Sequence, residues 1–157
     1  MSVFTQERLI ALNAAYARCI DNDELEQLGD FFLDQCLYLV TTADNYAAAL
    51  QAGIVYADTR AMLQDRVMAM RDANIYEEQR YRHIIGAPVL LEQKGDTAKA
   101  ESPFIVARIM RDGGTEVFAT GRYIDCIVAQ PDHPLKFAER VVVCDSCNID
   151  TLLVIPL

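Results

Sequence analysis

The second half of the chain contains long strand-like runs separated by turn residues, and this pattern constrains the fold more than any other feature. The runs span residues 79–93, 98–111, 115–129 and 135–144. Lys94-Gly95-Asp96 and Asp112-Gly113-Gly114 separate the first three runs and are typical of hairpin turns. Strands of about fourteen residues exceed the usual length of about five or six. The sequence therefore predicts an antiparallel meander that bends, with Pro103 and Gly121 as the bend or bulge points.

The first part of the chain shows helical spacing instead. Thr5 can cap a helix whose apolar residues recur at helical intervals from Leu9 to Ile20. Asp58 or Thr59 can cap another helix, with its apolar positions between 63 and 70. Both helices are amphipathic, so each is expected to bury one face.

A shorter helix and two strands are predicted between these two helices. Asp23 and Glu26 resemble a capping box that opens a short helix. Residues 35–42 and 54–57 are strand-like, and residues 44–53 are predicted to form a loop with an alanine-rich turn.

Helices first and strands afterwards indicate an α+β fold in which the helices cover the concave face of a curved sheet. The 157 residues, 52% of them apolar, suit one packed domain spanning 1–157. Helices are expected in about 5–73, the long-stranded meander in about 79–147 and an apolar tail in 152–157. Pro156 prevents this tail from continuing as a central strand, so we expect it to lie over its own domain or over another subunit.

The net charge of −9 and the absence of a basic cluster argue against nucleic acid as a partner. The uncharged runs are too short to cross a membrane, for which about 20 apolar residues are needed. The first residues lack the pattern of a secretory signal, so a cytoplasmic location is expected.

The five cysteines are expected to be reduced, and the Cys144-x-x-Cys147 motif lacks the second pair that a four-ligand zinc site requires.

The two histidines limit the chemistry of the chain. No histidine has a ligand-like spacing to a cysteine, and His133 lies in a proline-flanked turn, so neither a Rieske cluster nor a mononuclear iron triad can be built. Strand alternation places His83 and Tyr81 on the same face of the sheet. A catalytic His83 would need an orienting group. The candidates are Tyr16, Asp21, Asp44, Asp125 and Asp145. A hydrogen-bonded histidine in a partly buried network or at an interface is the favoured alternative.

Charged residues also occur within the predicted strands. They are Arg108, Arg122, Asp125, Glu139, Arg140 and, just after the last run, Asp145. We expect them on the solvated convex face, either as weak cross-strand pairs or as part of a wet protein interface.

Four segments carry a family resemblance. They are NAAYARCIDNDELEQLGDFF, CLYLVTTADNYAAALQAGIVYADTRAMLQDRVMAMRDANIYEEQRYRHIIGAP, ERVVVCDS and DTLLVIPL. With these segments the chain resembles the small (β) subunit of Rieske-type aromatic-ring-hydroxylating dioxygenases, within the branch that acts on aromatic acids such as terephthalate or salicylate. The resemblance implies the cone-like α+β fold of the nuclear transport factor 2 type.

The resemblance also implies a function and a set of partners. In this family the large (α) subunit holds the 2Fe-2S Rieske cluster and the mononuclear iron, and NAD(P)H supplies electrons through a reductase. The β subunit is mainly structural and forms a trimer beneath an α trimer, giving α3β3. This chain would then carry no catalytic, metal or cofactor residue. The matched positions that become interface candidates are Tyr81, Arg82, His83, Arg140 and Asp145.

A second function remains open at this point. A chain of the same fold could act alone as a cofactor-free isomerase, dehydratase or cyclase, with His83 working beside an aspartate or a tyrosine. Fold analogy alone does not separate the two functions.

Overall fold

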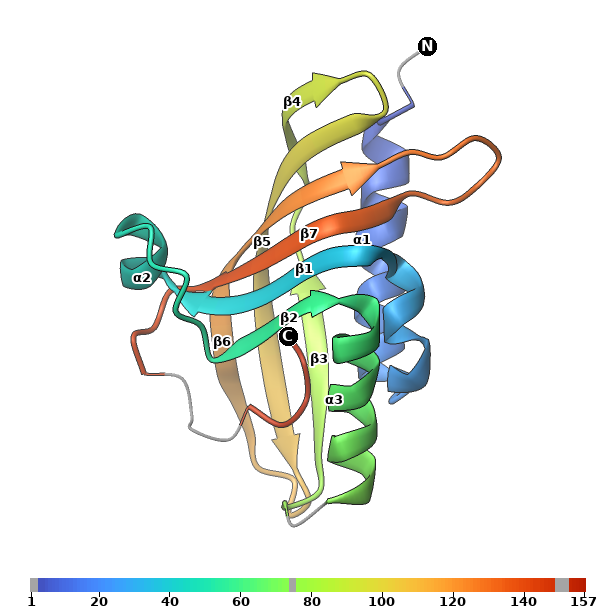
Figure 1. The fold of residues 1–157 in the computed structure, drawn as a ribbon. Helices are drawn as coiled ribbons and strands as arrows, with labels where there is room; N and C mark the ends of the chain where they lie inside the picture. Colours follow the sequence, from blue (N-terminus) through green and yellow to red (C-terminus); the bar gives the residue numbers. More distant parts are fainter. Residues whose placement is uncertain (1–2, 74–75, 149–152) are drawn as a thin grey trace.

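The computed structural model describes residues 3–73, 76–148 and 153–157 (Figure 1). Its elements follow in the order α1 (Gln6–Asp21), the 3₁₀-helix η1 (Leu25–Phe31), β1 (Phe32–Thr42), α2 (Ala43–Ala47), β2 (Val55–Thr59), α3 (Arg60–Asp72), β3 (Gln79–Ile85), β4 (Val89–Lys94), β5 (Thr97–Met110), β6 (Thr115–Val128) and β7 (Lys136–Cys144). Within these described residues, no helix is both long enough and apolar enough to cross a membrane.

The strands form a seven-stranded mixed sheet in the order β2-β1-β7-β6-β5-β3, and β4 pairs with β5 beyond the end of β3. Only the pairing of β1 with β7 is parallel among the described strands. Helix α1 packs against β3, and α3 packs against β1 and β2, so both helices cover one side of the curved sheet (Figure 1). The predicted α+β fold, with helices on a mostly antiparallel sheet, is confirmed.

The predicted starts of α1 and α3 are also confirmed, because the side chains of Thr5 and Thr59 accept hydrogen bonds from main-chain N–H groups in the first turns of these helices. The predicted capping box at Asp23 and Glu26 is wrong, because the short helix is the 3₁₀-helix η1, whose N-cap is Glu24 and has no side-chain hydrogen bond.

Residues 44–53 differ from the prediction. Helix α2 opens this segment, and the Thr42 side chain caps it by accepting from the N–H of Asn45 at 3.2 Å.

The predicted strand 79–93 is in fact two strands, β3 and β4, which both pair with β5. The break includes Gly86, whose N–H donates to the main-chain oxygen of Pro103 at 2.8 Å. A Cβ at position 86 would lie 2.7 Å from Pro103 Cγ, so only glycine fits against this proline.

The bulges of the long strands lie away from the predicted bend points. In the pairing of β5 with β6 the register shifts between Val106 and Ala107, and in that of β6 with β7 it shifts between Cys126 and Ile127. Gly121 has another role, because a Cβ there would lie 2.0 Å from the main-chain oxygen of Val143. It permits the close approach of β7.

The last residues turn back into the chain's own core. Leu153, Ile155 and Leu157 are buried in the main apolar cluster, and Figure 1 shows the red final segment turning back near β3 to end at the C label. The tail was expected to lie over its own domain or over another subunit, and the structure shows the first of these two positions. Residue 152 lies outside the described residues.

Candidate functional site

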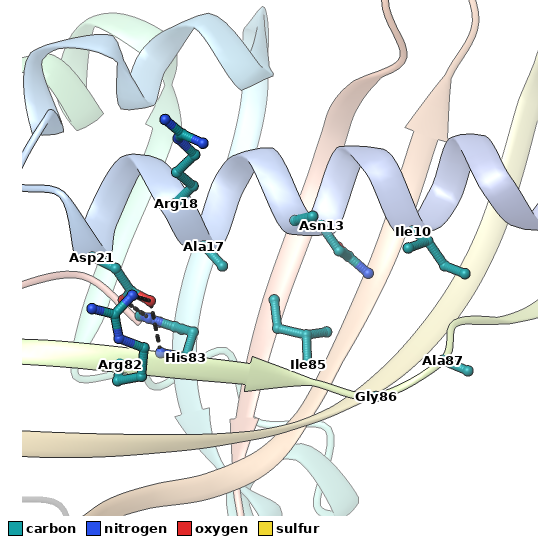
Figure 2. Close-up of a pocket in the computed structure, with 11 residues that line it drawn as sticks. Ile10, Asn13, Ala17, Arg18, Asp21, Arg82, His83, Ile85, Gly86 and Ala87 are labelled. Carbon is teal, nitrogen blue, oxygen red and sulfur yellow. Dashed lines mark hydrogen bonds and ion pairs between the residues drawn. The ribbon is translucent and has the colours of Figure 1, made fainter.

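The last residue of α1, Asp21, meets His83 of β3 (Figure 2). One Asp21 carboxylate oxygen lies 2.7 Å from His83 Nδ1, and the other accepts from the main-chain N–H of His83 at 2.9 Å. Both side chains are almost fully buried. Of the orienting groups considered from the sequence, Asp21 is the one that the structure brings to His83.

This geometry fixes which nitrogen of His83 is available for chemistry. Because Asp21 accepts at Nδ1, a neutral imidazole holds its proton there and presents Nε2 as an acceptor. Nε2 is buried and has no hydrogen-bond partner among the described residues. A carboxylate that orients a histidine in this way is an arrangement used in general acid–base catalysis.

A pocket of about 470 Å³ lies between α1 and the end of β3 (Figure 2). Its lining is mostly apolar and includes Ile10, Ala14, Ala17, Ile85 and Ala87. Asp21, His83 and Arg82 line the other end, where an Arg82 nitrogen lies 3.8 Å from the Asp21 carboxylate. The pocket could admit a small, largely apolar molecule beside a polar pair.

A second polar cluster lies deeper in the core and is centred on Arg140 of β7. Its guanidinium donates to the two carboxylate oxygens of Asp125 at 2.9 and 2.8 Å and to Asn13 Oδ1 at 2.5 Å. Asn13 in turn donates to Ser102 Oγ at 2.9 Å. The guanidinium carbon also lies close to the ring centroids of three aromatic residues. These are Tyr16 at 4.3 Å, Tyr123 at 4.1 Å and Phe137 at 3.9 Å.

The expectation of a solvated position is wrong for Asp125 and Arg140, which are 1% and 0% exposed. The two residues face each other in the pairing of β6 with β7, and Tyr38 is the β1 neighbour of Arg140 in the same row. This row points into the core. By contrast, Arg122 is a half-exposed surface partner of Glu101 at 3.5 Å, as expected.

The burial of this cluster changes the proton affinities of its members. Burial raises the pKa of Tyr16 to about 12 and holds that of Tyr123 well above 10. Burial also raises the pKa of the Asp125 carboxyl, against the opposing effect of Arg140. Burial disfavours the charge on Arg140, but Asp125 outweighs this effect and raises the pKa of the guanidinium. The bidentate geometry fits an ionised pair.

The other residues singled out from the sequence lie apart from the pair of Asp21 and His83 or take other roles. Tyr16 belongs to the Arg140 cluster, Asp44 is exposed on α2, and Asp145 is exposed and accepts from Thr120 Oγ1 at 2.9 Å. Among the five interface candidates, Arg82 and Asp145 are exposed, whereas Tyr81, His83 and Arg140 are buried in this chain. Their contact with a partner subunit stays a prediction.

Sequence reasoning missed Asn13 and Ser102 as members of the Arg140 cluster. The signal for Asn13 was present, because it lies four residues after Leu9 and three before Tyr16, on the buried face of α1. Ser102 carried a signal too, because β5 alternates from Ala98 to Val106 and places Ser102 on the buried face between Ala100 and Phe104.

The side chains do not fit an iron site in the described parts of the chain. No group of three or more His, Cys, Asp or Glu residues in 3–73, 76–148 and 153–157 could hold a metal ion. Asp21 also forms a hydrogen bond with Nδ1 of His83, so this nitrogen is not available to a metal ion. The residues present therefore do not match the ligand set of a Rieske cluster or of a two-histidine, one-carboxylate iron centre.

Comparison with known proteins finds a matching family model and similar relatives. The model of the ring hydroxylating beta subunit family matches residues 15–151. The beta 1 subunit of the terminal oxygenase component of terephthalate 1,2-dioxygenase from Comamonas sp. is 49% identical over 150 residues, which cover 96% of this chain and 97% of that protein. The anthranilate 1,2-dioxygenase small subunit from Burkholderia cepacia is 34% identical over 146 residues, covering 93% and 90%.

A solved structure extends the similarity to three dimensions. The beta subunit assigned to an aromatic-ring-hydroxylating dioxygenase from Novosphingobium aromaticivorans superimposes with a TM-score of 0.89 at 36% identity, covering 97% of this chain and 96% of that one. The cone-like fold of the nuclear transport factor 2 type, expected from the sequence, is confirmed by this structural neighbour. With its family model, its relatives and its fold in agreement, this chain belongs to the ring-hydroxylating dioxygenase beta subunits.

Proposed function

We propose that this chain is the non-catalytic beta subunit of an oxygenase complex that acts on an aromatic carboxylate, of the terephthalate type. Its partner is an alpha subunit that carries the 2Fe-2S Rieske cluster and the mononuclear iron and receives electrons from NAD(P)H through a reductase. The beta chain supplies a trimeric base in an α3β3 assembly.

One observation carries the non-catalytic role. Much of the cone interior, where a pocket enzyme would hold its substrate, is occupied by the chain's own buried aromatic rings and by the side chain of Leu157. Tyr16, Phe32, Tyr38 and Phe137 form edge-to-face and tilted ring pairs with one another there. The substrate class is supported by the 49% identity to a subunit of terephthalate 1,2-dioxygenase.

The proposal is tested by purifying the chain alone and together with a co-expressed alpha subunit. Alone, it should form a colourless oligomer without stoichiometric iron and should leave terephthalate unchanged. With the alpha subunit it should co-purify as a red-brown complex near the mass of a hexamer, and with a reductase and NAD(P)H this complex should oxidise terephthalate. One iron per chain in the protein purified alone would contradict the proposal.

The pocket beside Asp21 and His83 favours a second function, namely cofactor-free isomerisation, dehydration or cyclisation of a small apolar substrate. The chain alone would then convert such a substrate, and His83→Gln would abolish the activity while the protein stays folded. A panel of small hydroxylated aromatic compounds, followed by mass spectrometry, separates this function from the first. Under the proposed function the chain alone converts none of them.

A further inference from the structure

Residues 153–157 enter the cone interior without joining its sheet. The strand pairings of the sheet involve β1 to β7, and residues 153–157 belong to none of these strands. Leu153, Ile155 and Leu157 are nonetheless buried in the main core. The segment is thus held by burial and by hydrogen bonds to side chains, in the way that a receptor holds a peptide.

Two tyrosine hydroxyls converge on one main-chain oxygen of this segment. Tyr16 of α1 donates to the oxygen of Leu157 at 2.6 Å, and Tyr38 of β1 donates to the same oxygen at 2.8 Å. The Tyr38 hydroxyl also accepts from the N–H of Leu157 at 3.1 Å. The three hydrogen bonds define a site for a carbonyl or carboxylate oxygen with a neighbouring N–H donor.

The tyrosines are held in place by elements other than the tail. The Tyr16 ring packs edge-on against Phe137 of β7 with centroids 5.9 Å apart, and the Arg140 guanidinium lies over both of these rings. The Tyr38 ring packs edge-on against Phe32 at 5.9 Å. Burial raises the pKa of both phenols, so both hydroxyls keep their protons and remain donors at neutral pH.

We propose that the cone interior is a peptide-binding site, and that residues 153–157 are its intramolecular ligand. The ligand class is a short apolar segment that presents a main-chain carbonyl or carboxylate oxygen to Tyr16 and Tyr38. The same segment binds as a separate molecule when its covalent connection is removed. This inference does not depend on the proposed function, because it concerns only contacts within this chain.

The first test uses a chain that ends at residue 152 and a labelled Leu-Val-Ile-Pro-Leu pentapeptide. Fluorescence anisotropy should show saturable binding, and the peptide should raise the melting temperature of the truncated chain. A peptide with Asp in place of its last Leu should bind at least about tenfold more weakly, because the terminal side chain is fully buried.

Tyrosine variants of the truncated chain identify the site. Tyr38→Phe should weaken peptide binding about tenfold or more, since it removes both hydrogen bonds of that hydroxyl. The matched control Tyr46→Phe changes an exposed tyrosine on α2 and should leave binding unchanged. A folded truncated chain that does not bind the pentapeptide, or equal binding by Tyr38→Phe and Tyr46→Phe, would overturn the proposal.

A second experiment applies if the truncated chain fails to fold. A protease recognition sequence is inserted between the exposed residues Cys147 and Asn148 of the full chain, which is then cut after folding. Native mass spectrometry should show the released segment still bound, and it should exchange with an isotope-labelled copy added in excess. Unfolding on cleavage, or retention without any exchange, would show that residues 153–157 are an inseparable part of the core and would overturn the proposal.

Discussion

Two buried polar pairs on the inner side of the same sheet differ in their surroundings. Arg140 and Asp125 face each other on neighbouring strands, and three aromatic rings enclose the guanidinium. Asp21 and His83 join a helix to a strand beside a pocket, and His83 Nε2 has no partner among the described residues. The first pair is closed off and serves the core. The second pair has the geometry of acid–base chemistry, so it is the place where a catalytic role would have to lie.

Removing one partner of the enclosed pair should have the largest effect on stability. Arg140→Met leaves the Asp125 carboxylate buried without a cation, which typically costs about 3 to 5 kcal/mol. Denaturant unfolding followed by circular dichroism measures the loss. The matched surface variant Arg122→Met should cost less than about 1 kcal/mol, because its partner Glu101 is also exposed to solvent.

A double variant sharpens this result. Adding Asp125→Leu to Arg140→Met removes the orphaned charge, so it should recover part of the lost stability. Equal stability of Arg140→Met and Arg122→Met would contradict the view that the enclosed pair is a core element.

Alkaline unfolding should also report on the enclosed region. Tyr16 has a folded-state pKa of about 12 against an ordinary value of 10.0. Between these two pH values the unfolded chain has lost this proton while the folded chain keeps it, so stability falls as pH rises. The loss approaches about 1.4 kcal/mol per pH unit for this residue. Unfolding free energies measured from pH 9 to 12 should show a shallower fall in Tyr16→Phe, and an unchanged slope would contradict the assignment.

Breaking the second pair should have a smaller effect. Asp21→Ala removes the acceptor for the main-chain N–H and for Nδ1 of His83, and leaving these groups unsatisfied typically costs about 1 to 3 kcal/mol. The control Asp65→Ala, at an exposed position of α3, should stay within about 0.5 kcal/mol of wild type. Thermal unfolding of both variants makes the comparison, and equal melting temperatures would show that the pair does not stabilise the fold.

The smallest effect is expected at the edge of the pocket. The Arg82 side chain is 66% exposed and lies 3.8 Å from the Asp21 carboxylate, so the ion pair is weak. Arg82→Gln should change the unfolding free energy by less than about 0.5 kcal/mol. A loss as large as that of Asp21→Ala would show that Arg82 is an essential third member of the pair.

Local patterns in the sequence were sufficient for most elements but not for the sites. Capping by Thr5 and Thr59 and the hairpin turns after β4 and β5 are short-range features, so they predicted helix starts and strand ends. The break between β3 and β4 includes the contact of Gly86 with Pro103, which only the folded sheet creates.

The two buried polar pairs also depend on contacts that local sequence patterns do not predict. Alternation placed His83 on the correct face, but five candidates could have oriented it, because the choice of Asp21 depends on where α1 ends over β3. For Arg140 the charge itself was misleading. An arginine in a strand is usually solvated, and here the partners that permit its burial come from two other elements, α1 and β6.

The central claim, that this chain contributes no catalytic group to its oxygenase, is tested most directly by His83→Gln in the assembled complex with its alpha subunit. Turnover per intact complex, with assembly checked by sedimentation, is the quantity to measure. We predict a rate within a few-fold of wild type. A loss of about 10² to 10⁴, which is typical when a general acid or base is removed, would contradict the claim if assembly is unchanged.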